Sequence, residues 1–308
     1  MIDRVVSQLI TILLLMIAGY ALKKRNILDD GGARGLAAVL LRVTTPAMMI
    51  MAFQREYTKE LDRQFLTITG AAAAVFLALA LAGYLVTKAL PMDGPLRGTF
   101  ILGSFCSNVA FMGIPMISAV YGQEALIYSA GVIFGYNIVF FCLGPAVCHM
   151  GTDRKTSPGK AAISIVTNPV IIGGAIGYVI FRFSVALPSP VLSALDYLGS
   201  ATVPISMMTV GIALAAVTLR DFLDRYLYAG IAMNLIISPV VGWLISRALF
   251  PEAMIVGVFV VSTAMPAAGL MPALAAEEGG DPGFASRLVF VSTILSVFTI
   301  QWILGLLL

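Results

Sequence analysis

The chain has 308 residues, of which 59% are hydrophobic and only 11% are charged, and its net charge is +3. A soluble domain carries roughly 25% charged residues because water must wet its surface, so this composition excludes an ordinary soluble protein. No basic run is long enough to suggest a nucleic-acid-binding surface.

Long apolar segments follow one another along the whole chain, each near the length that crosses a hydrocarbon core of about 30 Å. Backbone groups in lipid must be hydrogen-bonded internally, so we expect these segments to be helices. A β-barrel would instead show short segments of alternating hydrophobicity. The sequence therefore predicts an all-α integral membrane protein with about ten spans. They lie at about 5–22, 36–53, 65–90, 96–121, 123–148, 161–181, 190–217, 226–249, 253–276 and 284–308.

Lys and Arg are distributed unevenly between the loops. The loops that follow odd-numbered segments hold 12 of these residues, and the termini and the other loops hold 6. Positive residues are retained on the cytoplasmic side of a membrane, so we expect both termini to be periplasmic or extracellular. The loop at 54–64 carries three of those 6 residues and opposes this bias.

Two proline landmarks recur at nearly the same offset. Pro46 and Pro204 stand 158 residues apart, Pro115 follows Pro46 by 69 residues, and Pro272 follows Pro204 by 68. Because each half holds an odd number of spans, the second half would cross the membrane in the opposite sense, which is an inverted repeat. A chance alignment is the alternative, since proline and methionine are both frequent (15 of each). The predicted division is residues 1–150 as the first five-helix repeat, 151–160 as a cytoplasmic linker loop, and 161–308 as the second repeat.

The fourth and ninth spans contain helix-breaking residues. A proline inside a helix removes a backbone hydrogen bond, so we expect the fourth helix to break at Pro115, about two turns after Asn108. The ninth span has Pro266 and Pro272 on either side of a small-residue stretch that includes Gly269. Two broken helices in corresponding places predict a binding site near the membrane midplane. Packing kinks joined by interhelical hydrogen bonds are the alternative.

Several motifs, taken together, resemble a known family. These are Asn108 to Pro115 followed by Tyr121-Gly122, then Asn168-Pro169, Pro204 to Gly211, and Ala264-Met265-Pro266. Their order and spacing resemble the auxin efflux carrier family (PIN-like) of the bile acid/arsenite/riboflavin transporter superfamily. The resemblance covers the whole chain.

This resemblance implies ten helices in two inverted five-helix repeats, with the broken fourth and ninth helices crossing at their proline breaks. It also implies scaffold and transport subdomains and an elevator-type alternating access. Family cargoes are small organic anions: auxin for plant members, and dicarboxylates such as malonate or malate for bacterial ones. Plant members typically have a second asparagine where this chain has Val170, and they have a long central loop. We therefore expect a bacterial inner-membrane member that transports a mono- or dicarboxylate such as malonate or malate. The alternatives are an efflux carrier for an auxin-like aromatic carboxylate, a channel, and a receptor that moves no cargo.

The residues that we expect at the site fall into three sets. Candidate substrate-binding residues are Asn108, Gly113, Pro115, Asn168, Pro266, Gly269 and Pro272. Candidate hinge or cavity-wall residues are Pro46, Met48, Pro204 and Met207, for which ordinary helix packing is the alternative. Candidate anion or coupling contacts are Arg42, Arg287, Thr202, Ser206 and Thr263, although the two arginines can also reach water from span ends and the hydroxyls can serve packing.

The acidic residues, Asp196 among them, are all expected at span ends or in loops, so no acidic sodium cage or carboxylate relay is predicted. Na⁺ or H⁺ coupling would then depend on backbone carbonyls and hydroxyls. One histidine and no paired acids argue against an enzyme, and neither a cofactor nor a metal is expected. The predicted partners are a small organic anion, the lipid bilayer and a second copy of the chain in a homodimer.

Overall fold

The computed structural model describes the chain except for residues 1, 151–158, 160–162, 164–165, 216–223 and 308. Apart from Gly159, the predicted linker at 151–160 therefore lies outside the described residues. The first half comprises α1 (Ile2–Lys24), α2 (Asp30–Val39), the π-helix η1 (Leu40–Thr44), α3 (Thr45–Ala52), α4 (Lys59–Ala89), α5 (Gly94–Phe105), the π-helix η2 (Val109–Gly113), α6 (Ile114–Tyr121), the 3₁₀-helix η3 (Gln123–Ala125) and α7 (Leu126–Cys148). The second half comprises α9 (Pro169–Arg182), α10 (Ser189–Ser200), α11 (Thr202–Leu214), α12 (Arg225–Ala232), the π-helix η5 (Met233–Ile237), α13 (Ser238–Leu249), α14 (Ala253–Ala264), α15 (Met271–Glu277) and α16 (Pro282–Leu307).

The protein is helical throughout the described elements and has several membrane-spanning candidates. In the described part of the chain, five helices are long and apolar enough to cross a membrane, or six if the two segments of the bent α16 are counted as one span. The five lie at Gly31–Ala52, Lys59–Ala89, Gln123–Cys148, Ser189–Ile212 and Arg225–Leu249. The fourth and ninth predicted spans are each divided into two short helices, α5 with η2–α6 and α14 with α15.

Hydroxyl groups compensate for the proline in the second predicted span. Pro46 lies in the first turn of α3, directly after the π-helix η1. The hydroxyls of Thr44 and Thr45 both donate to the carbonyl of Leu40, at 3.2 and 2.8 Å. Neighbouring hydroxyls are a usual way for a membrane helix to tolerate proline, and the helix therefore continues through this position.

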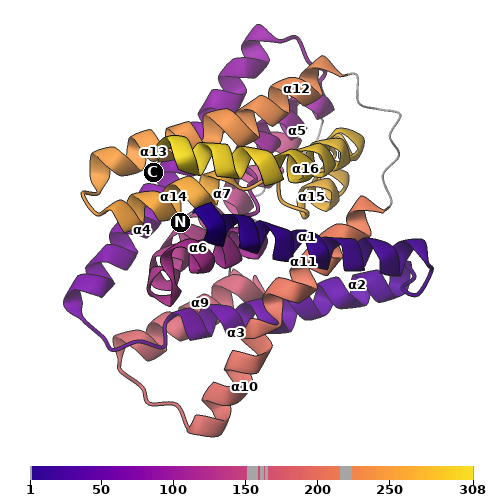
Figure 1. Cartoon of the computed structure of the whole chain (residues 1–308). Helices are drawn as coiled ribbons and strands as arrows, with labels where there is room; N and C mark the ends of the chain where they lie inside the picture. Colours follow the sequence, from indigo (N-terminus) through magenta and orange to yellow (C-terminus); the bar gives the residue numbers. More distant parts are fainter. Residues whose placement is uncertain (1, 151–158, 160–162, 164–165, 216–223, 308) are drawn as a thin grey trace.

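The helices pack into two groups, which lie in the lower and upper parts of the view in Figure 1. The small helix group contains α1–α3 with η1 and α9–α11. The large helix group contains α4–α7 and α12–α16. Contacts between the groups run chiefly through α6 and η2 against α1 and α11, through α16 against α1, and through α7 against α3 and α9.

Glycines bring helices of the two halves into close contact within the small helix group. A Cβ on Gly19 of α1 would overlap the carbonyl oxygen of Met208 in α11, and a Cβ on Gly177 of α9 would lie 3.0 Å from the Cα of Ile50 in α3. Gly19 and Gly177 are 158 residues apart, as are Ile50 and Met208. The offset that separates Pro46 from Pro204 in the sequence therefore also relates two backbone contacts in space.

Gly19→Ala should destabilise the protein, because the added methyl group has no room beside the Met208 backbone. Overpacking of this kind costs roughly 1–3 kcal/mol, which thermal or denaturant unfolding in detergent can measure. Gly35→Ala is the matched control: Gly35 lies inside α2 with nothing within 4 Å of the added Cβ, so this change should be neutral or stabilising. Equal effects of the two substitutions would contradict the close contact.

Candidate functional site at the two helix breaks

The breaks in the fourth and ninth predicted spans lie side by side. Ser107 and Ala267 form an isolated antiparallel bridge. The N–H of Asn108 donates to the carbonyl of Pro266 at 2.8 Å, and the N–H of Ala268 donates to the carbonyl of Cys106 at 3.1 Å. Each break thus supplies the hydrogen-bond partners that the other lacks.

The predicted position of the first break at Pro115 was wrong. Residues Cys106 to Asn108 separate α5 from η2, seven residues before Pro115, which lies in the first turn of α6. Pro272 likewise lies in the first turn of α15. A proline in the first turn of a separate helix such as α15 is tolerated because its missing N–H would have no intrahelical partner there. Pro115 instead lies inside the continuous helical run that η2 and α6 form. Pro266, in contrast, does lie in the second break, where its carbonyl accepts from Asn108.

Serine hydroxyls satisfy further backbone groups around the two breaks. The Ser107 Oγ lies 3.0 Å from the carbonyl oxygens of both Ser262 and Met265. The N–H of Ala267 donates to the Oγ of Ser292 at 3.1 Å. Such partners are required because a buried backbone group without a hydrogen bond costs several kcal/mol in lipid.

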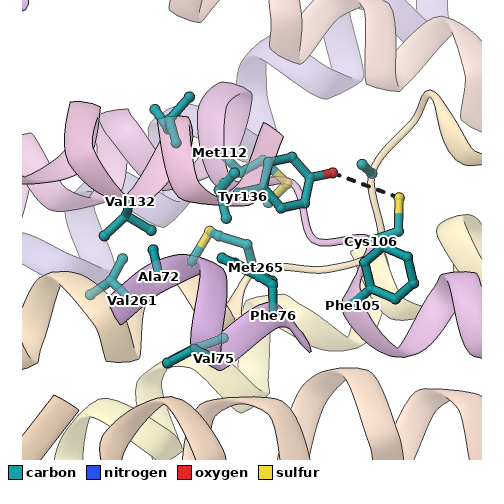
Figure 2. Close-up of a cluster of buried hydrophobic side chains, with 14 of the residues drawn as sticks. Ala72, Val75, Phe76, Phe105, Cys106, Met112, Val132, Tyr136, Val261 and Met265 are labelled. Atoms are coloured by element: carbon teal, nitrogen blue, oxygen red, sulfur yellow. Dashed lines mark hydrogen bonds between the residues drawn. The ribbon is translucent and has the colours of Figure 1, made fainter. Parts of the chain in front are cut away.

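The surroundings of the breaks are apolar and tightly packed. Figure 2 shows Cys106 and Met265 of the breaks among side chains of α4 and α7, with the Cys106 thiol 3.8 Å from the Tyr136 hydroxyl. Asn108 is only 4% exposed, and in the described structure its side chain makes no capping bond to η2. Its carboxamide is therefore a buried donor and acceptor at the start of a helix, where the N–H ends favour negative charge.

A cleft of ≈ 450 Å³ lies between the small and large helix groups. Met48, Gly199 and Val203 line it from α3, α10 and α11, and Pro115 and Ser118 line it from α6. The cleft continues to Gln123 in η3, at the start of the fifth predicted span and directly after the fourth. Neither Cys106–Asn108 nor Met265–Leu270 is among its lining residues, so the cleft approaches the breaks along α6 without reaching them.

Asp196, which we expected at a span end or in a loop, also lines this cleft. It lies within α10, with its side chain exposed. The backbone of Gly199, one turn further on, touches Met48, and this contact places α10 against α3 at the edge of the cleft. A polar network lies at the rim: Arg55 donates to the carbonyl of Gln123, whose Nε2 is 3.1 Å from the Ser118 Oγ.

Two of the predicted hinge or cavity-wall residues differ in what they face. Met48 lines the cleft, whereas Met207 is fully buried. Pro46 packs against Gly173 of α9, and Pro204 lies in the first turn of α11.

Among the predicted anion and coupling contacts, only Ser206 joins the two helix groups. Its hydroxyl lies 3.3 Å from the carbonyl of Phe111 in η2. Thr263 bonds within its own helix, to Phe259 at 2.7 Å, and the buried Thr202 hydroxyl has no partner among the described residues.

The two predicted arginines do not line the cleft. Arg287 lies 3.6 Å from Asp224 at the start of α12, and Arg42 is exposed on η1.

The other predicted substrate-binding residues are placed as follows. Asn168 caps α9, with its Oδ1 accepting from the N–H groups of Val170 and Ile171. Gly113 leaves its Cβ position 3.6 Å from Met265, and Gly269 is exposed with open space at its Cβ position.

Gln123 and Ser118 were not predicted as site residues, and neither position carries a clear signal in the sequence. Asp196 could have been found, since an acid within an apolar run is a functional candidate by default.

The chain was compared with known proteins. The sequence profile of the family described as "Membrane transport protein" matches residues 4–157 and, a second time, residues 153–304. An "uncharacterized transporter" of Methanocaldococcus jannaschii is 25% identical over 95% of this chain and 96% of its own length. Another from Methanothermobacter thermautotrophicus is 26% identical, over 94% of each chain. A protein of Rhizobium meliloti named "putative malonate transporter" is 24% identical over 95% of this chain and 92% of its own.

Ser107→Ala should lower the free energy of unfolding by about 1–3 kcal/mol, because it leaves buried carbonyls at the second break without a donor. Unfolding of the purified protein in detergent measures this loss. Ser286→Ala is the matched control, since its hydroxyl bonds only within α16, to Pro282. A Ser107 variant as stable as the control would mean that this hydroxyl does not hold the breaks together.

Proposed function

Since the chain belongs to the membrane transport protein family, which is the auxin efflux carrier family, we propose that it is a secondary transporter for a small organic anion, with malonate or malate as the first candidates. It is a multi-pass membrane protein of a transporter family and not an enzyme. The observation that carries the proposal is the pairing of two helix breaks beside a cleft between two helix groups. Irregular backbone at this depth is tolerated where it is buried or lines a cavity, and paired broken helices are typical of transporter binding sites.

We further propose ten spans in two inverted five-helix repeats, 1–150 and 161–308, joined by a cytoplasmic linker at 151–160. Three observations support this: the profile match to each half, the same order of long and broken helices in each half, and the reciprocal contacts of Gly19 with Met208 and Gly177 with Ile50. Five crossings per half would reverse the orientation of the second repeat.

The electrostatics of the first break favour an anion. The continuous turns from Val109 to Tyr121 begin at Asn108, and the N-terminus of a helix attracts a carboxylate through its free N–H groups and its dipole. The Asn108 carboxamide adds further donors. Malonate is chosen as the first cargo to test because it appears in the name of the Rhizobium meliloti relative.

In the proposed elevator motion, the large helix group carries the cargo past the small group, which acts as a scaffold. This motion would break two polar contacts between the groups, that of Ser206 with the Phe111 carbonyl and that of Asp62 with α9, and new partners would have to replace them. The Asp62 carboxylate accepts from the Tyr178 hydroxyl at 2.8 Å and lies 3.6 Å from Arg182. The cleft reaches the loop after the fourth span, which the Lys and Arg bias assigns to the outer side, so we assign this conformation as outward-open.

Asn108→Ala should reduce malonate uptake into proteoliposomes by at least about tenfold at low substrate concentration, which corresponds to about 1.4 kcal/mol of lost binding. The backbone bonds of Asn108 to the second break stay in place, so the fold should be retained. Radiolabelled malonate or malate uptake, saturable in the unmodified protein, gives the measurement.

Gln301→Ala serves as the matched control, because it removes an exposed carboxamide from α16. Uptake kinetics of Asn108→Ala equal to those of the control would overturn the assignment of Asn108. Absence of saturable uptake of any small carboxylate by the unmodified protein would overturn the proposed function.

Ser118→Cys, made in a Cys142→Ser background to remove the exposed thiol, should react with a membrane-impermeant maleimide added on the outer side. Saturating malonate should slow this reaction several-fold, because the cargo fills the cleft or because the large helix group carries the new cysteine inward. Glu56→Cys, on the exposed loop between α3 and α4, is the control that malonate should not protect. Equal labelling of both cysteines with and without malonate would contradict the use of this cleft.

A further inference from the structure

The cleft between the helix groups contains one charged side chain. Among the described residues that line it, only Asp196 is charged, and the others are apolar or neutral polar groups such as Ser118, Gln123 and Ser200. Asp196 forms no ion pair with any residue that the structure describes. Its carboxylate therefore faces the space into which we expect an anion to enter.

No cation among the described lining residues of the cleft compensates this charge. The elements packed against α10 are α3, η1 and α11, and the only charged residue on them is Arg42, which does not line the cleft. Across the cleft, the titratable groups on α6 and η3 are Tyr121 and Glu124. Arg55 lies at the rim, where it donates to the carbonyl of Gln123.

An ionised Asp196 and an anionic cargo would repel each other in this cleft. A carboxyl group is ionised near neutral pH in water, and the repulsion between two like charges grows as water is displaced by protein and cargo. A like charge brought close favours the neutral form of a carboxyl group. Protonation removes the repulsion and also makes the group a hydrogen-bond donor to the cargo.

We propose that Asp196 takes up a proton when the anion enters the cleft, so that the anion and one proton bind together. The proton comes from the solution at the open side of the cleft, binds a carboxylate oxygen of Asp196, and is released when the anion leaves. A proton needs only this carboxylate, whereas a hard metal cation needs a shell of several oxygen ligands. This inference rests on the proposed function, because it specifies the condition under which the same cleft accepts an organic anion.

The test measures the affinity of the purified protein for malonate by calorimetry between about pH 6 and pH 8, with Asp196→Asn beside the unmodified protein. The affinity of the unmodified protein, relative to that of Asp196→Asn at the same pH, should fall by up to about tenfold per pH unit as pH rises. This ratio cancels the titration of malonate itself. Calorimetric titrations in buffers of different ionisation enthalpy should show that the unmodified protein takes up about one more proton per bound malonate than Asp196→Asn does.

Three further variants define the outcome. Asp196→Ser is a second uncharged variant in case Asp196→Asn does not fold, and Asp196→Glu should retain the pH dependence. Glu56→Gln removes a carboxylate outside the cleft and should behave like the unmodified protein.

The inference is overturned if Asp196→Asn and the unmodified protein show the same pH dependence and proton uptake while both bind malonate. It is also overturned if the folded uncharged variants bind no malonate at any pH, which would make the charge attractive rather than repulsive. Malonate binding that depends on sodium rather than on pH would replace the proton by a metal cation. If the unmodified protein binds no small carboxylate at any pH, the proposed function itself fails, and this result differs from each of the others.

Discussion

Two backbone hydrogen bonds, from Asn108 to Pro266 and from Ala268 to Cys106, are the interaction on which the rest of this structure depends. A helix that stops inside a membrane leaves N–H and C=O groups that water cannot reach and that are costly to leave unpaired. Placing two breaks against each other satisfies groups of both at once. The short helices α5, α6, α14 and α15 can therefore end within the protein.

The same requirement explains how polar side chains are used elsewhere. Ser107 and Ser292 bond backbone groups at the breaks, and Thr44 and Thr45 bond the carbonyl of Leu40 before Pro46. Around these bonds the large helix group is packed with apolar and aromatic side chains (Figure 2). A dry, close-packed interior of this kind resists deformation. It is consistent with a large group that moves as one body against glycine-lined, closely packed helices of the small group.

Charge is placed sparingly, and its position matters more than its amount. Arg287 with Asp224, and Arg182 with Asp62, lie near helix ends, where each charge has an opposite partner. Asp196 differs because it lines a cleft and has no such partner in the described structure. In a site proposed for anions, an unpaired acid makes binding depend on proton concentration. Coupling to protons would then need neither an acidic sodium cage nor a metal site, and the sequence predicts neither of these.

Hydropathy and the proline pattern were enough to predict an all-helical membrane protein with two broken helices, and the resemblance of several short motifs was enough to predict the auxin efflux carrier family, because these signals are local. The sequence also placed Asn108 and Pro266 in the segments that meet. It misplaced the first break at Pro115, because a proline can also be accommodated inside a continuous helical run, as Pro115 is directly after the π-helix η2. The position of the actual break is decided by hydrogen bonds between segments about 160 residues apart. The role proposed for Asp196 is decided by which face of α10 turns toward α6. Both depend on tertiary packing, since neither the partner of a backbone group nor the direction of a side chain is encoded within one helix.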